Sequence, residues 1–506
     1  MSGSSFFFPS TGIGTARATL LAIDDVSLPL RTNLCYYLSK PTVRPQPLLT
    51  PRRDDPIAPD DAVTFFYGAV IHEDGPDWPG RPFRMWYYAA HWGESTGEMW
   101  SELKEGPVCY AESDDGVEWI RPSLGQVSFR GSRDNNIIAL PDFHTEGVHV
   151  IKDRDDPNPG QRYKMVYNYR PADRKFWTIR TATSPDGLQW AAGPELPFDG
   201  FIEQASLYKH NDLYWVNGQM HSRSEGGHRA GRQAFTIVSP NFDHWLPEHG
   251  ESFLMPEPAN PAERGGDKPY DQAHIGVGAT SFGNVLVGLY CIWHNVPYPT
   301  PEDWFGMGTT SGDFGLLISN DGQHFREPVK GHVWLHRNES PMTPIPNAQY
   351  ETIMTQGNGI LNVGDQTYIY HGRWGNSVNV TDYYAEIALA TLPRDRWGAL
   401  GLFPDQAEGS VWTCPLTLPD GDCHLILNAD RADDMHVEIA DERFNLLPGF
   451  SGTASGTSAV PGGLSCPVIW LAGSLTHLAG QTVRFRVQVK RQRTSEPRLY
   501  AIYLSQ

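Results

Sequence analysis

A seven-residue pattern of the form Ser-x-Asp-Gly-x-x-Trp recurs along the chain. It is complete at Ser113–Trp119 and Ser184–Trp190, and Ser319–Phe325 keeps it with Phe in place of Trp. Ser239–Trp245 and Thr391–Trp397 keep only the six-residue separation. Because Asp-Gly favours a tight turn, each copy predicts one strand that ends at the Ser and another that opens at the aromatic residue. Five copies indicate five repeats of one supersecondary unit.

The spacing of these copies predicts the fold class. Their aromatic residues are 55 to 80 residues apart, which leaves room for four short strands with loops. Aromatic-rich strands precede the copies, as at Phe83–Tyr88 and Tyr163–Tyr167. Radially arranged four-stranded sheets would produce this order, so we expect an all-β chain with a five-bladed β-propeller. The alternative is a large sandwich of unrelated hairpins.

Composition excludes several other classes. The 50 Gly and 41 Pro residues are too many for a coiled coil or a helical solenoid. The net charge of −19 would repel nucleic acid and anionic membranes, so neither is an expected partner. No basic leader and no long apolar run occurs, which predicts a soluble cytoplasmic protein. The six Cys form no CxxC pair and are expected as free buried thiols.

The chain changes character after Trp397. From about residue 405 onward, apolar and polar residues alternate between Gly and Pro turns, as in Val483–Val489. This alternation predicts a C-terminal β-sandwich. We therefore expect a catalytic propeller over residues 1–404 and a sandwich over residues 405–506.

Several segments resemble known glycosidases. The expected layout resembles glycoside hydrolase family 32, and the propeller alone resembles family 43. Phe201–Lys209 is similar to the family 43 element in which a Glu begins an innermost strand and acts as general acid, and Gly147–Asp153 is similar in placement to the strand that carries an Asp. Ala111–Trp119 and Arg162–Lys164 are the most recognisable stretches of a bacterial family-32-like type. The Asn-Asp-Pro-Asn signature of family 32 is absent near the N-terminus, and the first-blade stretch Tyr67–Ile71 has no carboxylate.

The resemblance implies a pair of carboxyl groups. Glycoside hydrolysis needs one protonated acid at the leaving oxygen and one carboxylate across the sugar ring. Glu203 is the predicted general acid. The second carboxylate is expected among four residues at predicted blade ends: Asp61, Glu146, Asp271 and Glu351. Each also has an ordinary interpretation as a solvated or salt-bridged loop residue.

Other polar and aromatic residues are candidates for substrate binding. His371 and Arg373 follow a strand of buried type and would suit sugar hydroxyls or a carboxylate, but a hydrogen-bond network between blades explains them equally well. Trp304, in a loop, is the candidate stacking platform at the rim. The full predicted set is His371, Arg373, His274, His149, Trp304 and Gln356.

Three functions follow from these residues. The first is a glycoside hydrolase or transglycosidase acting on a furanoside-containing oligosaccharide, in a pocket on the propeller axis and not between the domains. The second is a carbohydrate-binding propeller without catalysis, and the third is a polysaccharide lyase using His, Tyr or Arg. No phosphate loop or zinc-protease motif occurs, so no cofactor is expected, while a cation in the central channel is left open. The oligomeric state is not indicated.

Overall fold

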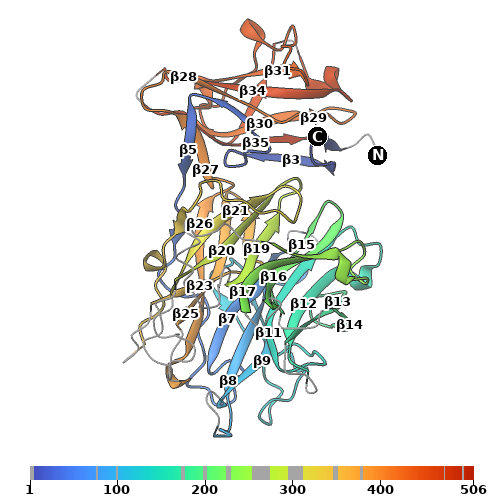
Figure 1. The fold of residues 1–506 in the computed structure, drawn as a ribbon, viewed down its shortest axis with the longest axis vertical. Coiled ribbons are helices and arrows are strands. Elements are labelled where there is room, and N and C mark those ends of the chain that lie inside the picture. Colours follow the sequence, from blue (N-terminus) through green and yellow to red (C-terminus); the bar gives the residue numbers. More distant parts are fainter. Residues whose placement is uncertain are drawn as a thin grey trace.

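In the computed structural model the chain is built from antiparallel β-sheets (Figure 1). The structure describes residues 5–73, 75, 78–97, 101–171, 177–197, 202–223, 229–253, 274–294, 311–345, 351–375, 380–471, 473–492 and 495–506. Helical segments in these ranges are short 3-10 turns: η1 (Pro159–Gln161), η2 (Pro247–His249), η5 (Arg337–Glu339), η6 (Val380–Asp382), η7 (Ala432–Asp434), η8 (Gly452–Ala454) and η9 (Leu475–Leu478). The all-β prediction is confirmed. Within these ranges no helix has the length and apolar character needed to span a membrane.

Three four-stranded antiparallel sheets follow one another along the chain. The first contains β7 (Val63–His72), β8 (Phe83–Trp92), β9 (Leu103–Ser113) and β10 (Trp119–Ile120). The second contains β11 (Thr145–Lys152), β12 (Tyr163–Tyr169), β13 (Thr178–Ser184) and β14 (Ala191–Glu195). The third contains β15 (Ile202–His210), β16 (Leu213–Arg223), β17 (Arg229–Ser239) and β18 (Gly250–Phe253).

The next sheet has nine strands and consists of two antiparallel parts. One part contains β19 (His274–Ser281), β20 (Leu286–His294), β21 (Ser311–Ser319) and β22 (Val333–Leu335). The other contains β23 (Ile353–Thr355), β24 (Ile360–Val363), β25 (Gln366–Gly375), β26 (Tyr384–Pro393) and β6 (Thr42–Val43). A parallel contact between Gly312 and Ile353 joins the two parts. The N-terminal segment thus supplies the last strand, β6, which pairs with β26.

The recurring motif forms a turn that is stabilised by its own side chains. Ser113 Oγ accepts a hydrogen bond from the backbone N–H of Gly116 at 2.9 Å. Asp115 Oδ1 accepts from the two backbone N–H groups that follow the glycine, each at 2.8 Å. Gly116 has φ of 78°, and a Cβ there would lie 2.5 Å from Tyr370 Oη. Glycine is therefore required both by the left-handed backbone and by the close neighbour.

Four of the five motif copies form this turn. Ser184–Trp190 and Ser319–Phe325 repeat its hydrogen bonds. The degenerate copy Ser239–Trp245 also forms it, with Asn241 in the Asp position and Phe242 at a positive φ of 67°. In Thr391–Trp397 the positive φ falls one residue later, at Asp395, so this copy makes a different turn.

The motif turns also connect neighbouring sheets. The carbonyl of the motif glycine accepts a side-chain hydrogen bond from another sheet: Tyr370 Oη donates to Gly116 at 2.9 Å, and Trp86 Nε1 donates to Gly187 at 3.0 Å. Tyr208 Oη donates to Gly322 at 2.6 Å. Three copies of the repeat therefore join their sheet to a neighbouring one in addition to reversing the chain.

Asn358, between β23 and β24, joins three other sheet-leading strands. Its N–H donates to Gly68 O at 2.9 Å, and its carbonyl accepts from Val70 N at 2.9 Å. Its side-chain amide exchanges hydrogen bonds with both backbone groups of Leu207 and donates to Ala279 O at 3.1 Å. These contacts reach β7, β15 and β19. We call β7, β11, β15, β19 and β24 the leading strands.

The remaining strands form two seven-stranded sheets that share one hydrophobic core. One sheet contains β2 (Ile13–Thr15), β1 (Phe6–Phe8), β29 (Leu416–Thr417), β34 (Thr482–Lys490), β28 (Glu408–Trp412), β4 (Leu30–Thr32) and β31 (Met435–Asp441). The other contains β32 (Thr457–Ser458), β33 (Gly463–Ile469), β30 (His424–Asp430), β35 (Arg498–Ser505), β27 (Gly398–Leu402), β5 (Leu34–Leu38) and β3 (Arg17–Leu21).

The N-terminal strands extend across the expected domain division. The sequence placed residues 1–404 in one domain, but β3 pairs with β35 and β5 pairs with β27. In Figure 1 these blue N-terminal strands lie among the orange and red C-terminal ones, above the other sheets. Burial of their apolar residues in the C-terminal core stabilises this arrangement, and the alternation that revealed the C-terminal strands was too short to see in them.

Specific polar contacts fix the two seven-stranded sheets, which we call the upper sheets, against the sheets below them in Figure 1. The side-chain amide of Asn284 exchanges two hydrogen bonds with the backbone of Thr19, at 2.8 and 2.9 Å. Asp24, which is buried, accepts from Asn320 Nδ2 at 2.8 Å and pairs with Arg326 at 2.5 Å. None of the six cysteines, all of which lie in the described ranges, forms a disulfide, as expected, and five of them are buried.

Replacing Asn358 tests whether it holds the leading strands together. Asn358→Ala would leave the backbone groups of Leu207 and Ala279 without their partners, each costing about 1–3 kcal/mol. We expect the free energy of unfolding to fall by about 3 kcal/mol or more, measured by urea denaturation. The exposed Asn338→Ala is the control and should change it by less than about 0.5 kcal/mol. A similar small effect for Asn358→Ala would contradict the assignment.

Candidate functional site

Two carboxylates from neighbouring leading strands line one small pocket. Glu146 lies near the start of β11 and Glu203 near the start of β15. Both are half-buried. The pocket is completed by four residues: Tyr67, Gly147, Asn168 and Gln204. The structure therefore brings together two of the five carboxylates that the sequence indicated.

A β-bulge positions Glu146. The register of β11 against β12 shifts between Glu146 and Val148. Gly147, inside the bulge, has φ of 81°, a conformation that L side chains rarely adopt. The bulge interrupts the regular alternation of side chains, so Glu146 lines the pocket at a point where its strand is bent. Neighbouring Gln204 Nε2 donates to Gly147 O at 3.1 Å and ties the bulge to β15.

Glu203 is held by the next strand and by a second bulge. The register of β15 against β16 shifts between Gln204 and Ser206, one residue beyond Glu203. Asn168 Oδ1 accepts the backbone N–H of Gln204 at 3.2 Å, which joins this bulge to the second sheet. Gln219 Nε2 donates to Glu203 Oε2, and Gln219 itself is buried. A carboxyl group oriented by a buried amide has a defined direction for proton transfer.

A cluster of aromatic rings, which we call the aromatic wall, includes Tyr67, the aromatic residue that lines the pocket. The ring centroids of Phe65 and Tyr67 are 4.4 Å apart, and those of Phe65 and Trp374 are 5.3 Å apart. The ring of Trp374 also lies 6.0 Å from that of Tyr383. Burial raises the pKa of Tyr67 well above its usual value, and the charges of both pocket carboxylates add to the shift. At neutral pH these phenols are hydrogen-bond donors and not bases.

A third carboxyl group, Glu105 on β9, was missed by the sequence analysis. Burial raises the pKa of Glu105 to about 7, and the charge of Arg170 offsets only part of this shift. Burial is also the main cause that raises the pKa of Tyr383 in the aromatic wall, and the charges of Glu146 and Glu105 add to it. Glu105 therefore belongs to the same electrostatic environment as the pocket. Its sequence context contains no signal that distinguishes it from an exposed strand residue.

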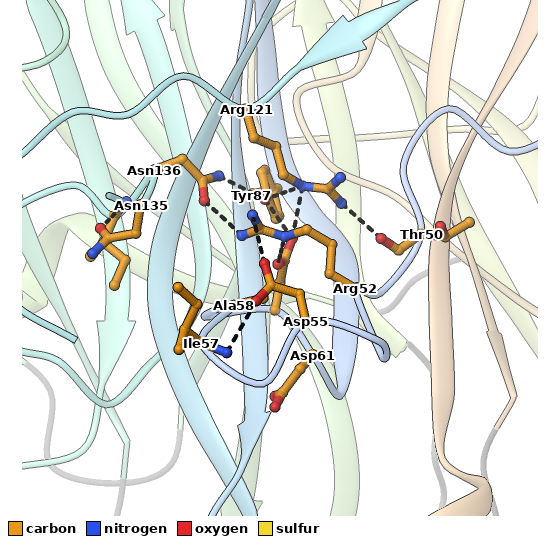
Figure 2. A network of polar contacts seen from close by, with 12 residues as sticks. Thr50, Arg52, Asp55, Ile57, Ala58, Asp61, Tyr87, Arg121, Asn135 and Asn136 are labelled. Atoms are coloured by element: carbon orange, nitrogen blue, oxygen red, sulfur yellow. Dashed lines mark hydrogen bonds and ion pairs between the residues drawn. The ribbon is translucent and has the colours of Figure 1, made fainter. Parts of the chain in front are cut away.

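Asp61 has a structural role instead. Arg130 pairs with it at 2.7 Å, and Asp61 Oδ1 accepts the backbone N–H of Trp92 at 3.0 Å. The adjacent Asp60 is wholly buried and accepts from Arg52 at 2.6 Å. Figure 2 shows the surrounding network. In it the guanidinium of Arg52 also donates a hydrogen bond to Asn136 Oδ1 at 3.1 Å, and Asp61 lies to one side. These ion pairs hold the loop before β7 in place.

Glu351 lies outside the pocket. It is exposed, and its carboxylate pairs with Arg337 at 2.9 Å. The same guanidinium contacts the buried Asp313 at 3.1 Å, and Asp313 accepts from His294 Nε2 at 2.8 Å. Glu351 is therefore part of a polar cluster between β21 and the start of β23, and is not among the residues that line the carboxylate pocket.

His371 and Arg373 belong to buried networks, the alternative that the sequence left open. His371 Nε2 lies 2.8 Å from Ser340 Oγ, and burial, together with the charge of Arg373, lowers the pKa of His371 to about 3. Arg373 donates to the carbonyls of Arg44 and Pro45 at 2.7 and 2.9 Å. It thereby fixes the N-terminal segment that follows β6. Neither side chain lines the pocket.

His149 and Gln356 are buried as well. His149 is wholly buried, neither ring nitrogen has a hydrogen-bond partner among the described residues, and burial lowers its pKa to about 3. Gln356 Nε2 donates to Gly276 O at 2.6 Å and joins β19 to the segment after β23. His274 pairs with Cys291 in the β19–β20 register. Asp271 and Trp304 lie outside the described residues.

A larger cavity, of about 670 Å³, lies at the opposite ends of the leading strands. It shares no lining residue with the carboxylate pocket, and residues 14–16 of the N-terminal strands also line it. The sequence predicts an active pocket on the propeller axis and not between the domains. A larger cavity that reaches residues 14–16, next to the upper sheets, counts against that prediction. The two pockets occupy different ends of the same strands.

Among the described residues, no group of three or more His, Cys, Asp or Glu side chains is arranged to hold a metal ion.

Comparison with known proteins gives distant structural likeness only. No protein-family model matches the chain, and no curated protein matches it. A structure of a putative glycoside hydrolase from Bacteroides ovatus is 16% identical, with a TM-score of 0.38, over 74% of this chain and 96% of that chain. An N-acetylgalactosamine deacetylase from F. plautii in complex with blood group B trisaccharide is 11% identical, with a TM-score of 0.40, over 72% and 96%.

A third structure, a family 43 endo-arabinanase from Bacillus licheniformis, is 9% identical with a TM-score of 0.35, over 66% of this chain and 95% of that chain. All three TM-scores are below 0.5. These likenesses therefore carry no argument about the activity of this chain, and the assignment of function depends on its own residues.

Removing His149 tests its burial in the neutral form. The pKa of His149 in the folded protein lies below the usual value of about 6.5. The contribution of neutral His149 to stability is therefore complete above pH 6.5 and is lost as pH falls toward 3. We expect His149→Leu to reduce the slope of unfolding free energy against pH, between pH 6 and 4, by about 1.4 kcal/mol per pH unit. Exposed His477→Leu is the control. Equal slopes in all three proteins would show that His149 is not buried uncharged.

Glu105→Gln tests whether the fold carries a destabilised carboxyl group. The pKa of Glu105 is raised, so the folded state keeps a proton that the unfolded chain loses near pH 4.3. Stability is therefore lost as pH rises from about 4.3 to about 7, and the loss is complete above that. We expect Glu105→Gln to increase the unfolding free energy at pH 8 by about 2 kcal/mol and to change it little at pH 4. The exposed Glu118→Gln should have no such pH-dependent effect. A destabilised Glu105→Gln protein at pH 8 would contradict this prediction.

Proposed function

We propose that this protein is a glycoside hydrolase or transglycosidase that uses Glu203 and Glu146 in a two-carboxylate mechanism. The observation that carries the proposal is their position on neighbouring leading strands, lining one pocket. Cleavage of a glycosidic bond requires a proton donor and a second carboxylate close to the anomeric carbon. Glu203 and Glu146, on neighbouring strands, supply a pair of carboxyl groups for these two roles.

The proposed scaffold is a five-bladed β-propeller followed by a β-sandwich. The three four-stranded sheets supply three blades, and the two parts of the nine-stranded sheet supply two more. Support comes from the motif turns that connect consecutive sheets and from Asn358, which contacts the leading strands β7 and β15 of two other sheets and β19 in the other part of its own sheet. The two upper sheets with their shared core correspond to the sandwich, which includes the N-terminal strands.

In the proposed mechanism, Glu203 donates its proton to the glycosidic oxygen as the bond to the anomeric carbon breaks. The donated hydrogen bond from Gln219 would orient the carboxyl group for this transfer. Glu146, ionised, stabilises the positive charge that develops on the sugar. It then either bonds to the anomeric carbon or removes a proton from the attacking water, and the anomeric configuration of the product distinguishes these two routes.

The proposed substrate is a furanoside-containing oligosaccharide. This preference depends on the resemblance of Phe201–Lys209 to the family 43 element, and Tyr67 places an aromatic ring in the wall of the carboxylate pocket. The net charge of −19 favours a neutral substrate over an acidic polymer. A cytoplasmic location and a reaction without cofactor stay predictions from the sequence.

The two alternatives differ in what the pocket has to do. A lyase needs a side chain that removes a proton from carbon at working pH. The tyrosines near the pocket, Tyr67, Tyr88 and Tyr383, have pKa values raised well above the usual value by burial, which disfavours them as bases. A binding protein without catalysis would need no oriented acid such as Glu203, and activity measurements separate it from the proposal.

Glu203→Gln and Glu146→Gln test the mechanism. Each keeps the shape of the side chain but cannot donate a proton or carry the charge, so turnover should fall by roughly 10²–10⁴. Stability should change by less than about 1 kcal/mol, measured by urea denaturation. With aryl furanosides that carry an activated leaving group, the loss for Glu203→Gln should be smaller, because little protonation is needed.

Glu351→Gln is the matched control, because this carboxylate is exposed and pairs with Arg337 away from the pocket. It should retain nearly normal turnover. If Glu203→Gln folds and turns over a natural glycoside at the normal rate, the assignment of the acid is wrong. If neither pocket variant binds nor cleaves differently from the unaltered protein, the pocket is not the active site.

A further inference from the structure

The cavity of about 670 Å³ at the far ends of the leading strands has features of a second binding site. Residues from all five leading strands line it, together with residues 14–16. Asn358 also lines it and is hydrogen-bonded to β7, β15 and β19, which places a bonded layer between this cavity and the Glu146–Glu203 pocket. Its volume lies within the range of about 300–1,000 Å³ typical of small-molecule sites.

Two lysines at the ends of neighbouring strands are held in the cavity wall by similar triads. Lys152, at the end of β11, pairs with Glu73, which also accepts from the hydroxyl of Tyr163. Lys209, near the end of β15, pairs with both oxygens of Asp153 at 3.0 and 3.1 Å. Tyr214 completes that triad: it donates to Asp153 from the start of the next strand. The two triads repeat one arrangement between successive sheets.

Each triad places its positive end on the cavity side. The side chains of Glu73 and Asp153 are 1% and 3% exposed, while those of Lys152 and Lys209 are 22% and 26% exposed. The carboxylates are therefore less exposed than the ammonium groups, and Asp153 lines the cavity together with the two lysines. An ammonium has three N–H donors, and pairing with one carboxylate leaves donor capacity directed elsewhere. Ion pairs arranged in this way are electrically neutral as a whole but offer donors and positive charge to the cavity.

The hydrogen bonds of the second triad keep it ionised. Burial opposes ionisation of Asp153, but hydrogen bonds from Tyr214 and Lys209 more than offset it, so the pKa of Asp153 lies below its usual range. Lys209 therefore remains paired across the neutral range. Two acidic residues, Asp155 and Asp212, are exposed and also line the cavity, where they would oppose an anion.

We propose that this cavity binds the oxyanion group of a small ligand, a phosphate or a carboxylate, through Lys152 and Lys209. The ligand would lie between the leading-strand ends and the N-terminal strands, apart from the carboxylate pocket. Because the lysines are already held by buried partners, little side-chain entropy is lost when an anion binds. This site does not depend on the proposed glycosidase function.

Isothermal titration calorimetry at low ionic strength and pH 7 tests the proposal with four probes: inorganic phosphate, glucose 6-phosphate, glucuronate and glucose. We expect at least one anionic probe to bind and glucose not to bind. The ratio of phosphate to glucuronate affinity identifies which oxyanion is preferred. Affinity should fall as salt is added, because the contact is electrostatic. Absence of binding by every anionic probe, or equal binding of glucose and glucose 6-phosphate, would overturn the proposal.

Variants locate the binding. Lys209→Gln should weaken the anionic probe by about tenfold, whereas Lys209→Arg keeps the charge and should retain affinity within about threefold. Asp212→Asn removes an opposing exposed charge without touching a triad and should tighten binding by about twofold to threefold. This gain keeps the test decisive if Lys209→Gln folds poorly. Unchanged or weaker binding by Asp212→Asn would overturn the assignment.

Glu203→Gln separates this proposal from the glycosidase. It should bind the anionic probe as the unaltered protein does, since the carboxylate pocket shares no lining residue with the cavity. If Glu203→Gln abolishes probe binding, the anion occupies the carboxylate pocket and the second site is wrong, whatever the result for turnover.

Discussion

The hydrogen bonding of Asn358 is the constraint on which the centre of this molecule depends. Leading strands that approach one another edge to edge cannot form an ordinary ladder, so some of their backbone groups need other partners. One buried asparagine supplies these for Gly68, Leu207 and Ala279. Asn168 and Asn217 have the same role at the bulges of β15 and β19, where they accept backbone N–H groups at 3.2 and 2.7 Å.

These bulges also explain why the candidate active site lies where it does. A regular strand would alternate its side chains, and Glu146 and Glu203 would have to share space with the packing residues between sheets. Each bulge frees one residue from that alternation. The polar side chains near a bulge then line a pocket, while the rest of the strand, such as Val148 and Leu207, packs in the hydrophobic core. The same bulges therefore determine both how the leading strands pack and where the candidate active site lies.

The sequence predicted the parts of the fold that depend on local chemistry. The Ser-x-Asp-Gly-x-x-Trp turns form because Ser113, Asp115 and Gly116 bond within one segment. The pairing of β6 with β26 could not be predicted, because two residues carry no periodicity and their partners lie about 350 positions away.

The candidate site was predicted in part for a related reason. Glu203 and Glu146 were found through a resemblance that concerns strand starts. His371 and Arg373 were expected after a strand, but they lie within β25 and belong to a buried network. Which face a side chain takes depends on the neighbouring sheet, and Glu105 was missed because its raised pKa arises from burial by residues distant in sequence.

The pairing of β3 with β35 has a consequence for how the chain acquires its structure during synthesis. Arg17–Leu21 are synthesised about 480 residues before their partners in Ala501–Ser505. At roughly 5–20 residues per second, the N-terminal strands wait on the order of 25–100 s with their apolar side chains uncovered. The segment has the pattern of an unpaired strand edge during this interval, so binding by a chaperone or a transient non-native pairing would act first on these residues.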